Sequence, residues 1–142
     1  MNAAVLETPA SGAAAPNHAT LLQVDALNAW YGSAHILFDV SLDVRRGEVV
    51  ALMGRNGAGK STTFKAIMGL LGKRQGQVSF MGKPIMGLQP YEIARLGLGF
   101  VPEDRRIFTG LTVTENLDVG RQPPRRWPDG SEPLTWTPAA LY

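Results

Sequence analysis

The stretch Gly54-Arg-Asn-Gly-Ala-Gly-Lys60-Ser61 decides the fold class of this 142-residue chain. It fits the pattern G-x-x-x-x-G-K-[ST], in which a glycine-rich turn wraps its backbone N–H groups around a phosphate. Gly57 and Gly59 supply the backbone freedom that such a turn requires. The pattern places the Lys60 ammonium between the terminal phosphates of a nucleotide and assigns the Ser61 hydroxyl to a Mg²⁺ ion. The stretch therefore predicts a nucleotide site.

The elements on either side of this loop are the ones that the pattern requires. The β-branched run from Val49 to Met53 predicts a strand buried on both faces. After Lys60, apolar residues recur at i, i+3, i+4 and i+7, as on one face of a helix: Phe64, Ile67, Met68 and Leu71. Gly72 is the expected stop of that helix. A strand, a glycine loop and a helix in this order turn the pattern into a candidate site.

The residues before the loop predict a two-stranded layer behind an unstructured leader. An apolar segment runs from Leu21 to Tyr31, and strict alternation follows at Ile36, Phe38, Val40, Leu42 and Val44. A period of two predicts a half-buried strand that pairs with its predecessor. Residues 1–20 are rich in Ala, Pro, Gly, Ser and Thr, and they bury too little apolar surface to offset their ordering entropy. We therefore expect a flexible leader over 1–20 and one domain over 21–142.

Further elements are expected downstream of the helix. The pattern predicts a strand over 77–81, a helix over 90–96 closed by Gly97, and a strand over 98–101 that stops at Pro102. Thr112-Val-Thr-Glu115 has the capping-box spacing and predicts a helix to about Gly120. The prolines at 123, 124, 128, 133 and 138 forbid a continuous helix or central strand beyond it. Thr137 and Pro138 are typical of the start of another helix.

The composition excludes several classes of protein. The chain has no cysteine, so disulfides, thiolate metal sites and a nucleophilic cysteine are ruled out. The longest apolar run, from Val49 to Met53, is far shorter than the ~20 residues of a membrane helix. No Lys or Arg precedes an apolar core at the amino end, so we expect no secretory signal. The net charge of +2 is mild and the basic residues are scattered, so no nucleic-acid partner is expected.

A phosphate loop alone does not say which class of nucleotide-binding protein carries it. A GTPase of the Ras type would add Asp-x-x-Gly and Asn-Lys-x-Asp, and neither follows Ser61. A small-molecule kinase would add a lid with clustered arginines. That alternative stays open because of five arginines downstream: Arg105, Arg106, Arg121, Arg125 and Arg126.

Two longer blocks are more specific. They read VSLDVRRGEVVALMGRNGAGKST over 40–62 and GLGFVPEDRRIFTGLTVTENL over 97–117. Together with Tyr31, which lies 23 residues ahead of Gly54, they resemble the ATP-binding subunits of ABC transporters. The second block resembles most the high-affinity branched-chain amino-acid uptake subfamily. The resemblance covers 21–142 and implies an α/β fold: a P-loop NTPase core of the ABC ATPase type with a small antiparallel β layer, its sheet incomplete because the chain is truncated.

The resemblance also implies roles for individual residues. Tyr31 matches the aromatic residue that stacks on adenine, and the alternative is that Tyr31, beside Trp30, packs on the strand layer. The ATP phosphates would be held by the loop and the residue after it: Gly54, Arg55, Asn56, Gly57, Ala58, Gly59, Lys60, Ser61 and Thr62. Glu103 stands where most ABC ATPases have the Q-loop glutamine, and with Ser61 it is the expected Mg²⁺ ligand. A glutamate there departs from the wider family but agrees with the branched-chain branch, and a solvated loop glutamate is the alternative.

Several family elements are missing from the sequence. The Ser-Gly-Gly signature, the strand ending in the Mg²⁺-binding aspartate, the adjacent catalytic glutamate and the switch histidine are absent. The two histidines precede the phosphate loop, and we interpret His18, in the leader, and His35, in a hairpin turn, as bystanders. The resemblance therefore implies the amino-terminal part of a longer protein, to which we assign no catalytic residue.

The function implied by the resemblance is that of an ATP-binding subunit of an ABC importer for branched-chain amino acids. It would couple MgATP binding and hydrolysis to transport, and this chain is expected to be inactive alone. The implied partners are transmembrane permease subunits, a second ATP-binding subunit in a homo- or heterodimer and, indirectly, a periplasmic binding protein. The implied location is cytoplasmic, peripheral on the inner face of the plasma membrane. The alternative is a nucleotide-binding fragment or regulator that does not hydrolyse ATP.

Overall fold

A computed structural model describes residues 4–6, 19–104, 106–133 and 137–141. These residues belong to two compact units, 1–100 and 101–142, and each unit is described by itself. The elements of the first unit are β1 (Ala4–Leu6), β2 (Thr20–Tyr31), β3 (Ala34–Arg45), β4 (Ala51–Met53), α1 (Lys60–Ile67), β5 (Lys73–Phe80), β6 (Lys83–Pro84) and α2 (Pro90–Leu96). Those of the second are α3 (Val113–Val119) and α4 (Pro138–Leu141).

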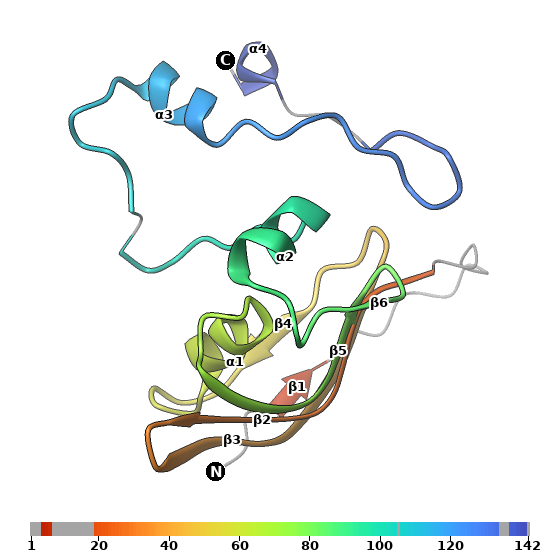
Figure 1. Cartoon of the computed structure of the whole chain (residues 1–142), viewed down its shortest axis with the longest axis vertical. Helices are drawn as coiled ribbons and strands as arrows, with labels where there is room; N and C mark the ends of the chain where they lie inside the picture. The colour runs from red at the N-terminus through yellow and green to blue at the C-terminus, as the bar shows by residue number, and fades with distance from the viewer. Residues whose placement is uncertain (1–3, 7–18, 105, 134–136, 142) are drawn as a thin grey trace. The chain divides into compact units, whose positions relative to one another are not determined.

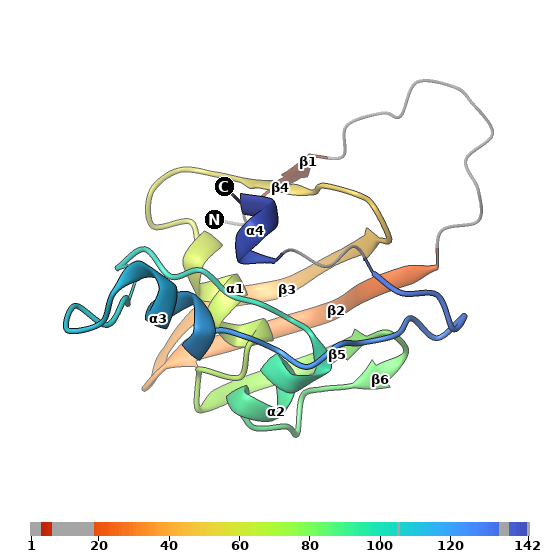
Figure 2. The ribbon, with the colours of Figure 1, turned by 90° about the horizontal axis from the view of Figure 1, so that it is seen from above.

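The first unit is built on a four-stranded antiparallel sheet. Its strand order is β3-β2-β5-β6, and Figure 2 shows these strands side by side. Helix α1 lies on one face of the sheet (Figure 1), and the side chains between them form the core. The most deeply buried core residues are Leu27, Ala29, Ala66, Ile85 and Ile93, each with no exposed surface. The predicted antiparallel layer and its hairpin are thus present.

The strict alternation predicted for β3 is wrong at the centre of the strand. Leu37 and Val40 are buried, whereas Phe38 is 43% exposed. The reason is a bulge: Asp39 has a φ of +49°, and the partner strand carries a matching distortion at Ala26, with a φ of +47°. An extra residue in a strand shifts which side chains face the core. The bulges therefore reset the alternation between the two halves of the hairpin.

The helix after the glycine loop is shorter than predicted. It ends at Ile67, and Gly69, with a φ of +75°, turns the chain before Gly72 is reached. Phe64 is 47% exposed and does not belong to the buried face. The buried residues of the helix are Thr62, Thr63, Ala66 and Ile67.

A half-buried arginine, Arg74, fixes the turn at the end of α1. The Arg74 guanidinium donates to the carbonyl oxygens of Ala66 at 2.6 Å and Met86 at 2.8 Å. It therefore binds a carbonyl of the last turn of α1 and the segment that leads into α2. Burial lowers the pKa of Arg74 from its ordinary value, but an arginine stays cationic at neutral pH.

The strand ahead of the glycine loop was predicted to be buried on both faces, and this prediction is wrong. Only Ala51–Met53 form β4, which pairs antiparallel with β1 in a two-stranded sheet. Val49 is 88% exposed and Met53 is 53% exposed. Within the described residues this small sheet has no third strand, so these apolar side chains stay uncovered. The remainder of the expected leader, residues 1–3 and 7–18 with His18, lies outside the described residues, and its flexibility stays a prediction.

The downstream helices follow the prediction closely. Helix α2 spans Pro90–Leu96 and is closed by Gly97, which has a φ of +116°. Helix α3 begins with the predicted capping box, in which Thr112 and Glu115 bond reciprocally, and ends at Val119. Helix α4 begins at Pro138 as predicted. The strand predicted over 98–101 is wrong, because no described strand pairs with that segment.

The second unit contains a loop held by one side chain. Asn116 Oδ1 accepts from the Phe108 N–H at 2.9 Å, and Asn116 Nδ2 donates to the carbonyl oxygens of Phe108, Leu111 and Thr112. These bonds fold residues 108–112 onto the start of α3. None of the helices in the described ranges is long and apolar enough to cross a membrane.

Candidate nucleotide-phosphate site

The glycine loop forms a tight turn that leads into the amino end of α1. Gly57 and Gly59 have φ values of +83° and +92°, a region in which other L-residues are strained. The Ala58 N–H donates to the Arg55 carbonyl at 3.0 Å and closes the turn. Gly59 is the N-cap residue of α1 and carries no capping side chain. The prediction that these two glycines supply backbone freedom is therefore confirmed.

Gly59 is also held by packing. A Cβ at this position would lie 2.7 Å from Leu37 Cδ2, which is closer than a real Cβ contact. A Cβ at Gly57 would meet nothing within 4 Å, so only its φ requires glycine. The loop thus rests on β3 at one point, and sequence analysis missed this contact, because the pattern carries no signal for what lies across from Gly59.

Lys60 folds back over its own loop. Its Nζ donates to the carbonyl oxygens of Gly54 at 2.7 Å and Arg55 at 2.9 Å. The ammonium therefore lies beside the turn whose N–H groups would meet an anion. The contact of Lys60 with nucleotide phosphates stays a prediction.

The electrostatics at the start of α1 favour an anion. The first turn of the helix contains no acidic residue, while the partial positive charge of its amino end is reinforced by Lys60. Thr63 Oγ1 donates to the Gly59 carbonyl at 3.0 Å and the Thr63 N–H donates to it at 2.8 Å, which ties the loop to the helix. Thr63 is fully buried, and the motif gave no indication of this role.

Ser61 and Thr62 follow the loop in α1. Ser61 lies half-buried on the first turn of α1, and Thr62 is 9% exposed. A serine hydroxyl suits Mg²⁺, which prefers oxygen ligands and commonly keeps waters and substrate phosphates as the others. Among the described residues, no group of three or more His, Asp or Glu side chains could hold a metal ion. The Mg²⁺ role of Ser61 and the ATP contact of Thr62 stay predictions.

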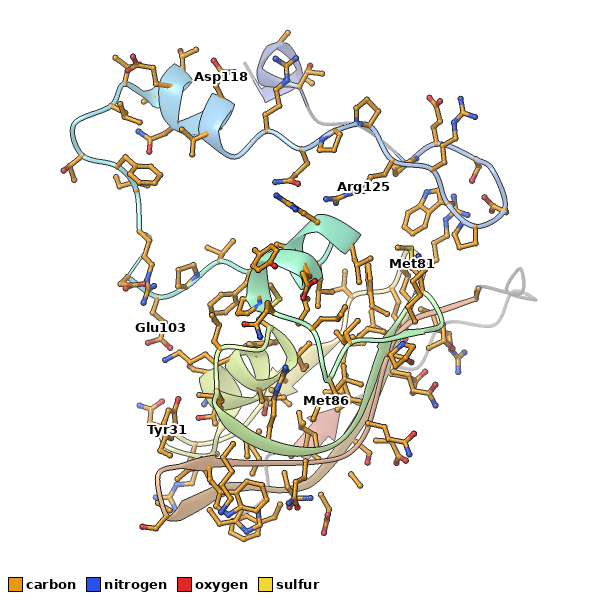
Figure 3. All side chains as sticks on the ribbon, viewed as in Figure 1. Tyr31, Met81, Met86, Glu103, Asp118 and Arg125 are labelled. Atoms are coloured by element: carbon orange, nitrogen blue, oxygen red, sulfur yellow. The ribbon has the colours of Figure 1, made fainter. Side chains whose placement is uncertain are left out.

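Tyr31 lies at the end of β2 beside the hairpin turn (Figure 3). It is two residues beyond the buried Ala29, so alternation places both on the face that α1 covers. Trp30 points the other way and stacks on His35, with ring centroids 4.2 Å apart. The Tyr31 side chain is 46% exposed, so it is not fully packed on the strand layer. Its adenine contact stays a prediction.

His35 was predicted to lie in the hairpin turn, and this prediction is wrong. It lies in β3, paired with Trp30, and the turn consists of Gly32 and Ser33. The turn is shorter than expected because Gly32 takes a φ of +58°. A glycine with positive φ at the first central position is typical of a two-residue hairpin turn.

Glu103 belongs to the second unit and is exposed. It lies between Pro102 and Asp104 in a segment without regular structure. Its role as a Mg²⁺ ligand stays a prediction.

Three of the five arginines of the proposed kinase lid have local partners. Arg106 Nε lies 2.9 Å from Asp104 Oδ2, Arg125 donates to Gln122 at 3.1 Å, and Arg126 lies 3.6 Å from Glu132. Arg105 lies outside the described residues. Side chains engaged with near neighbours do not favour a lid that converges on phosphates.

Comparison with known proteins agrees with this geometry. The family model described as ABC transporter matches residues 37–139. A probable ABC transporter ATP-binding protein of Azorhizobium caulinodans is 47% identical over 61% of this chain and 31% of its own length. A probable branched-chain amino acid transport ATP-binding protein of Archaeoglobus fulgidus is 41% identical over 70% of this chain and 42% of its own. A lipopolysaccharide export system ATP-binding protein of Haemophilus influenzae is 41% identical over 69% and 41%.

A solved structure of the ATP-binding subunit of an ABC transporter is also similar. Its TM-score is 0.61 at 42% identity, over 70% of this chain and 41% of that one. The fold is that of a P-loop nucleotide-binding domain, and the predicted fold class is confirmed. The chain belongs to the ABC transporter family and is part of an ATP-binding domain. It spans 31% to 42% of the length of the three relatives above. Members of this family bind ATP.

Proposed function

We propose that this chain is the part of an ABC transporter ATP-binding subunit that holds the phosphates and base of MgATP. The observation that carries the proposal is the arrangement at the start of α1. There the turn through Gly57 and Gly59 leads into a helix end without acidic residues, and the Lys60 ammonium lies beside it on the Gly54 and Arg55 carbonyls. All three features favour an anion with several negative oxygens.

Each residue has a separate task in this proposal. The N–H groups of residues 54–59 surround the phosphates, and Lys60 exchanges its loop carbonyls for phosphate oxygens. Ser61 and Thr62 follow on the first turn of α1, where the Ser61 hydroxyl is one ligand of Mg²⁺ and Glu103 approaches it directly or through water. When bound, Mg²⁺ offsets the negative charge of the terminal phosphates. Tyr31 stacks on the base.

The finer assignment is an importer of branched-chain amino acids. The block over 97–117 and the similarity to the Archaeoglobus protein support it. The lipopolysaccharide export protein has the same sequence identity to this chain, 41%. The nucleotide-binding domain itself therefore does not determine the solute. The proposed partners are transmembrane permease subunits, a second ATP-binding subunit and, indirectly, a periplasmic binding protein. The proposed location is the inner face of the plasma membrane.

The second candidate function is a nucleotide-binding fragment or regulator that does not hydrolyse ATP. The exposed Met53 favours it, since this residue precedes the loop at the end of β4, in a sheet that has no third described strand. A phosphate loop on such a sheet can bind phosphates without being able to position an attacking water. The two candidates share the binding site and differ in turnover.

The experiment that tests the shared site compares two lysines of α1. MgATP is titrated into the parent, Lys60→Ala and Lys65→Ala, with binding followed by calorimetry and by the amide NMR signals of Gly57 and Gly59. Lys65 is the matched control, because it lies in the last turn of the same helix. We expect weak binding by the parent and by Lys65→Ala, and its loss in Lys60→Ala. Equal affinity in all three proteins would refute the role of Lys60.

A further inference from the structure

Three aromatic rings form a stack on the face of the sheet that points away from α1. The rings of Trp30 and His35 are nearly parallel, with centroids 4.2 Å apart and 12° between their planes. The His35 and Phe38 rings are tilted by 41° with centroids 3.9 Å apart. We call these three residues the outer stack. It lies near the hairpin turn, and its first residue, Trp30, directly precedes Tyr31 in the chain.

Trp30 is held from both neighbouring strands. It occupies β2, the strand between β3 and β5, where its cross-strand partners are His35 and Lys73. The Lys73 ammonium lies 4.9 Å from the centroid of the indole ring, and such a cation is attracted by the face of the ring. The indole therefore has an imidazole from β3 and an ammonium from β5 against it, which fixes the end of the central strand.

His35 is tied in turn to the two bulges. Its Nε2 lies 2.9 Å from Asn28 Oδ1, and this oxygen also accepts from the Asp39 N–H. The Asn28 amide donates to Asp39 Oδ1 at 2.7 Å and to the Ala26 carbonyl at 3.0 Å. Because Asn28 Oδ1 is an acceptor, the proton in the bond lies on His35 Nε2. The imidazole thus couples the outer stack to Ala26 and Asp39, the residues whose positive φ values define the bulges.

The position of Tyr31 depends on this stack. A single cross-strand pair, Tyr31 with Ala34, separates Trp30 and His35 from the turn at Gly32 and Ser33. Ala34 offers only a methyl group to its partner, and the Tyr31 ring is 46% exposed. Cross-strand side-chain pairs are the main source of stability at a hairpin end. The Trp30–His35 pair is therefore the contact that holds the backbone from which Tyr31 projects.

We propose that the outer stack positions Tyr31 for an adenine base, with His35 as the positioning residue. His35 does not touch the nucleotide, and it acts by fixing Trp30, the neighbour of Tyr31 in β2. The inference rests on the proposed function, since it assigns Tyr31 to the base of ATP. Its consequence is specific: the outer stack contributes to binding of the base and not to binding of the phosphates at the glycine loop.

The test separates the base from the phosphates. MgATP and inorganic tripolyphosphate, which has phosphates and no base, are titrated into the parent, His35→Ala, His35→Phe and Tyr91→Ala, with binding followed by NMR. We expect His35→Ala to lower ATP affinity by about three- to tenfold, which is part of the binding free energy of one base–aromatic stack. The tripolyphosphate affinity should not change. His35→Phe keeps a ring and restores most of the loss. Tyr91→Ala, an exposed aromatic on α2, changes neither affinity.

The outcomes distinguish the two proposals. An unchanged ratio of ATP to tripolyphosphate affinity in His35→Ala would overturn the positioning role, and so would a loss of both affinities by the same factor. If neither ligand shifts the glycine amides of the parent, the proposed function fails. The positioning role is then decided by the Tyr31 ring signals, which His35→Ala must shift or broaden. Should His35→Ala not fold, Phe38→Ala removes only the half-exposed outer ring and is judged by the same ratio and signals.

Discussion

Gly59 and Leu37 are in such close contact that no side chain fits between them: a Cβ on Gly59 would lie 2.7 Å from Leu37 Cδ2. Gly59 also has a φ of +92°. One residue thus meets two demands, one from the turn that leads into α1 and one from the strand beneath it. The contact joins the phosphate loop to the hydrophobic core, because Leu37 is only 2% exposed.

The first prediction is that Gly59→Ala destabilises the loop by about 2–5 kcal/mol. Left-handed alanine costs about 1–2 kcal/mol, and overpacking adds about 1–3 kcal/mol. The measurement is hydrogen exchange at the Thr63 amide, which donates to the Gly59 carbonyl. Adding Leu37→Val removes the overpacking, so the double variant should lose about 1 kcal/mol less than the sum of the single variants. Strict additivity would show that the contact has no energetic consequence.

The second prediction concerns Arg74. Arg74→Met keeps the apolar stem but removes the donor to the Met86 carbonyl and leaves the Ala66 carbonyl with the Gly69 N–H alone. We expect a loss of about 1–3 kcal/mol, the range for half-buried polar groups deprived of a partner. Hydrogen exchange at the buried Ile93 and Val78 amides measures it. Lys83→Met, on the exposed strand β6, is the control and should change these rates little. Equal effects of the two substitutions would contradict the role of Arg74.

The third prediction is a pH dependence at the start of α3. Hydrogen bonds from the backbone N–H and hydroxyl of Thr112 lower the pKa of Glu115. A lowered pKa in the folded state means that the capping box stabilises α3 above the ordinary pKa of glutamate. This contribution is lost as the pH falls through the lowered value. Carbon NMR of the Glu115 carboxyl and the Thr112 amide shift should report the transition together.

Thr112→Val is the matched variant for this titration. It removes the hydroxyl and keeps the backbone N–H, so the pKa of Glu115 should rise part of the way toward its ordinary value. An unchanged pKa would mean that the hydroxyl does not contribute. In Glu115→Gln, the Thr112 amide should no longer respond to pH over this range.

The fourth prediction concerns the uncovered sheet. Strand β4 has exposed apolar side chains, and exposed strands of this kind pair with other chains. The chain should associate as its concentration rises and should not melt in one sharp transition. Sedimentation should show less association for the double variant Val49→Lys and Met53→Lys. Val119→Lys, which changes an exposed apolar residue of α3, should have little effect. A chain that stays monomeric as its concentration rises and melts in one sharp transition would contradict this prediction.

The fifth prediction is catalytic. Phosphoryl transfer requires a group that positions water and charges that stabilise the γ-phosphate. Glu103 is assigned to sensing and to Mg²⁺, so no residue of this chain is assigned to activate water. We expect no ATP turnover above background, and recovery when the part of a related subunit that this chain does not cover is supplied. A phosphate-release assay measures it, and multiple turnovers abolished by Lys60→Ala would show that the assignment is wrong.

The amino-acid sequence by itself determined the local features of this protein. The turn at Gly57 and Gly59, helix α2 with Gly97 at its end, and the capping box of Thr112 and Glu115 all appear where the pattern places them. These features depend on backbone conformation and on hydrogen bonds between residues a few positions apart. Such preferences are properties of the residues themselves, and distant parts of the chain change them little.

Only the tertiary structure decided what is buried and what those features rest on. The apolar run from Val49 to Met53 is not buried on both faces, because burial depends on which elements cover a strand and not on its own composition. Other features join residues far apart in the chain. They are the paired bulges at Ala26 and Asp39, the packing of Leu37 on Gly59, and the contact of Arg74 with the last turn of α1. A pattern read along one segment carries no information about its partner across the core, which is why these relationships required the fold.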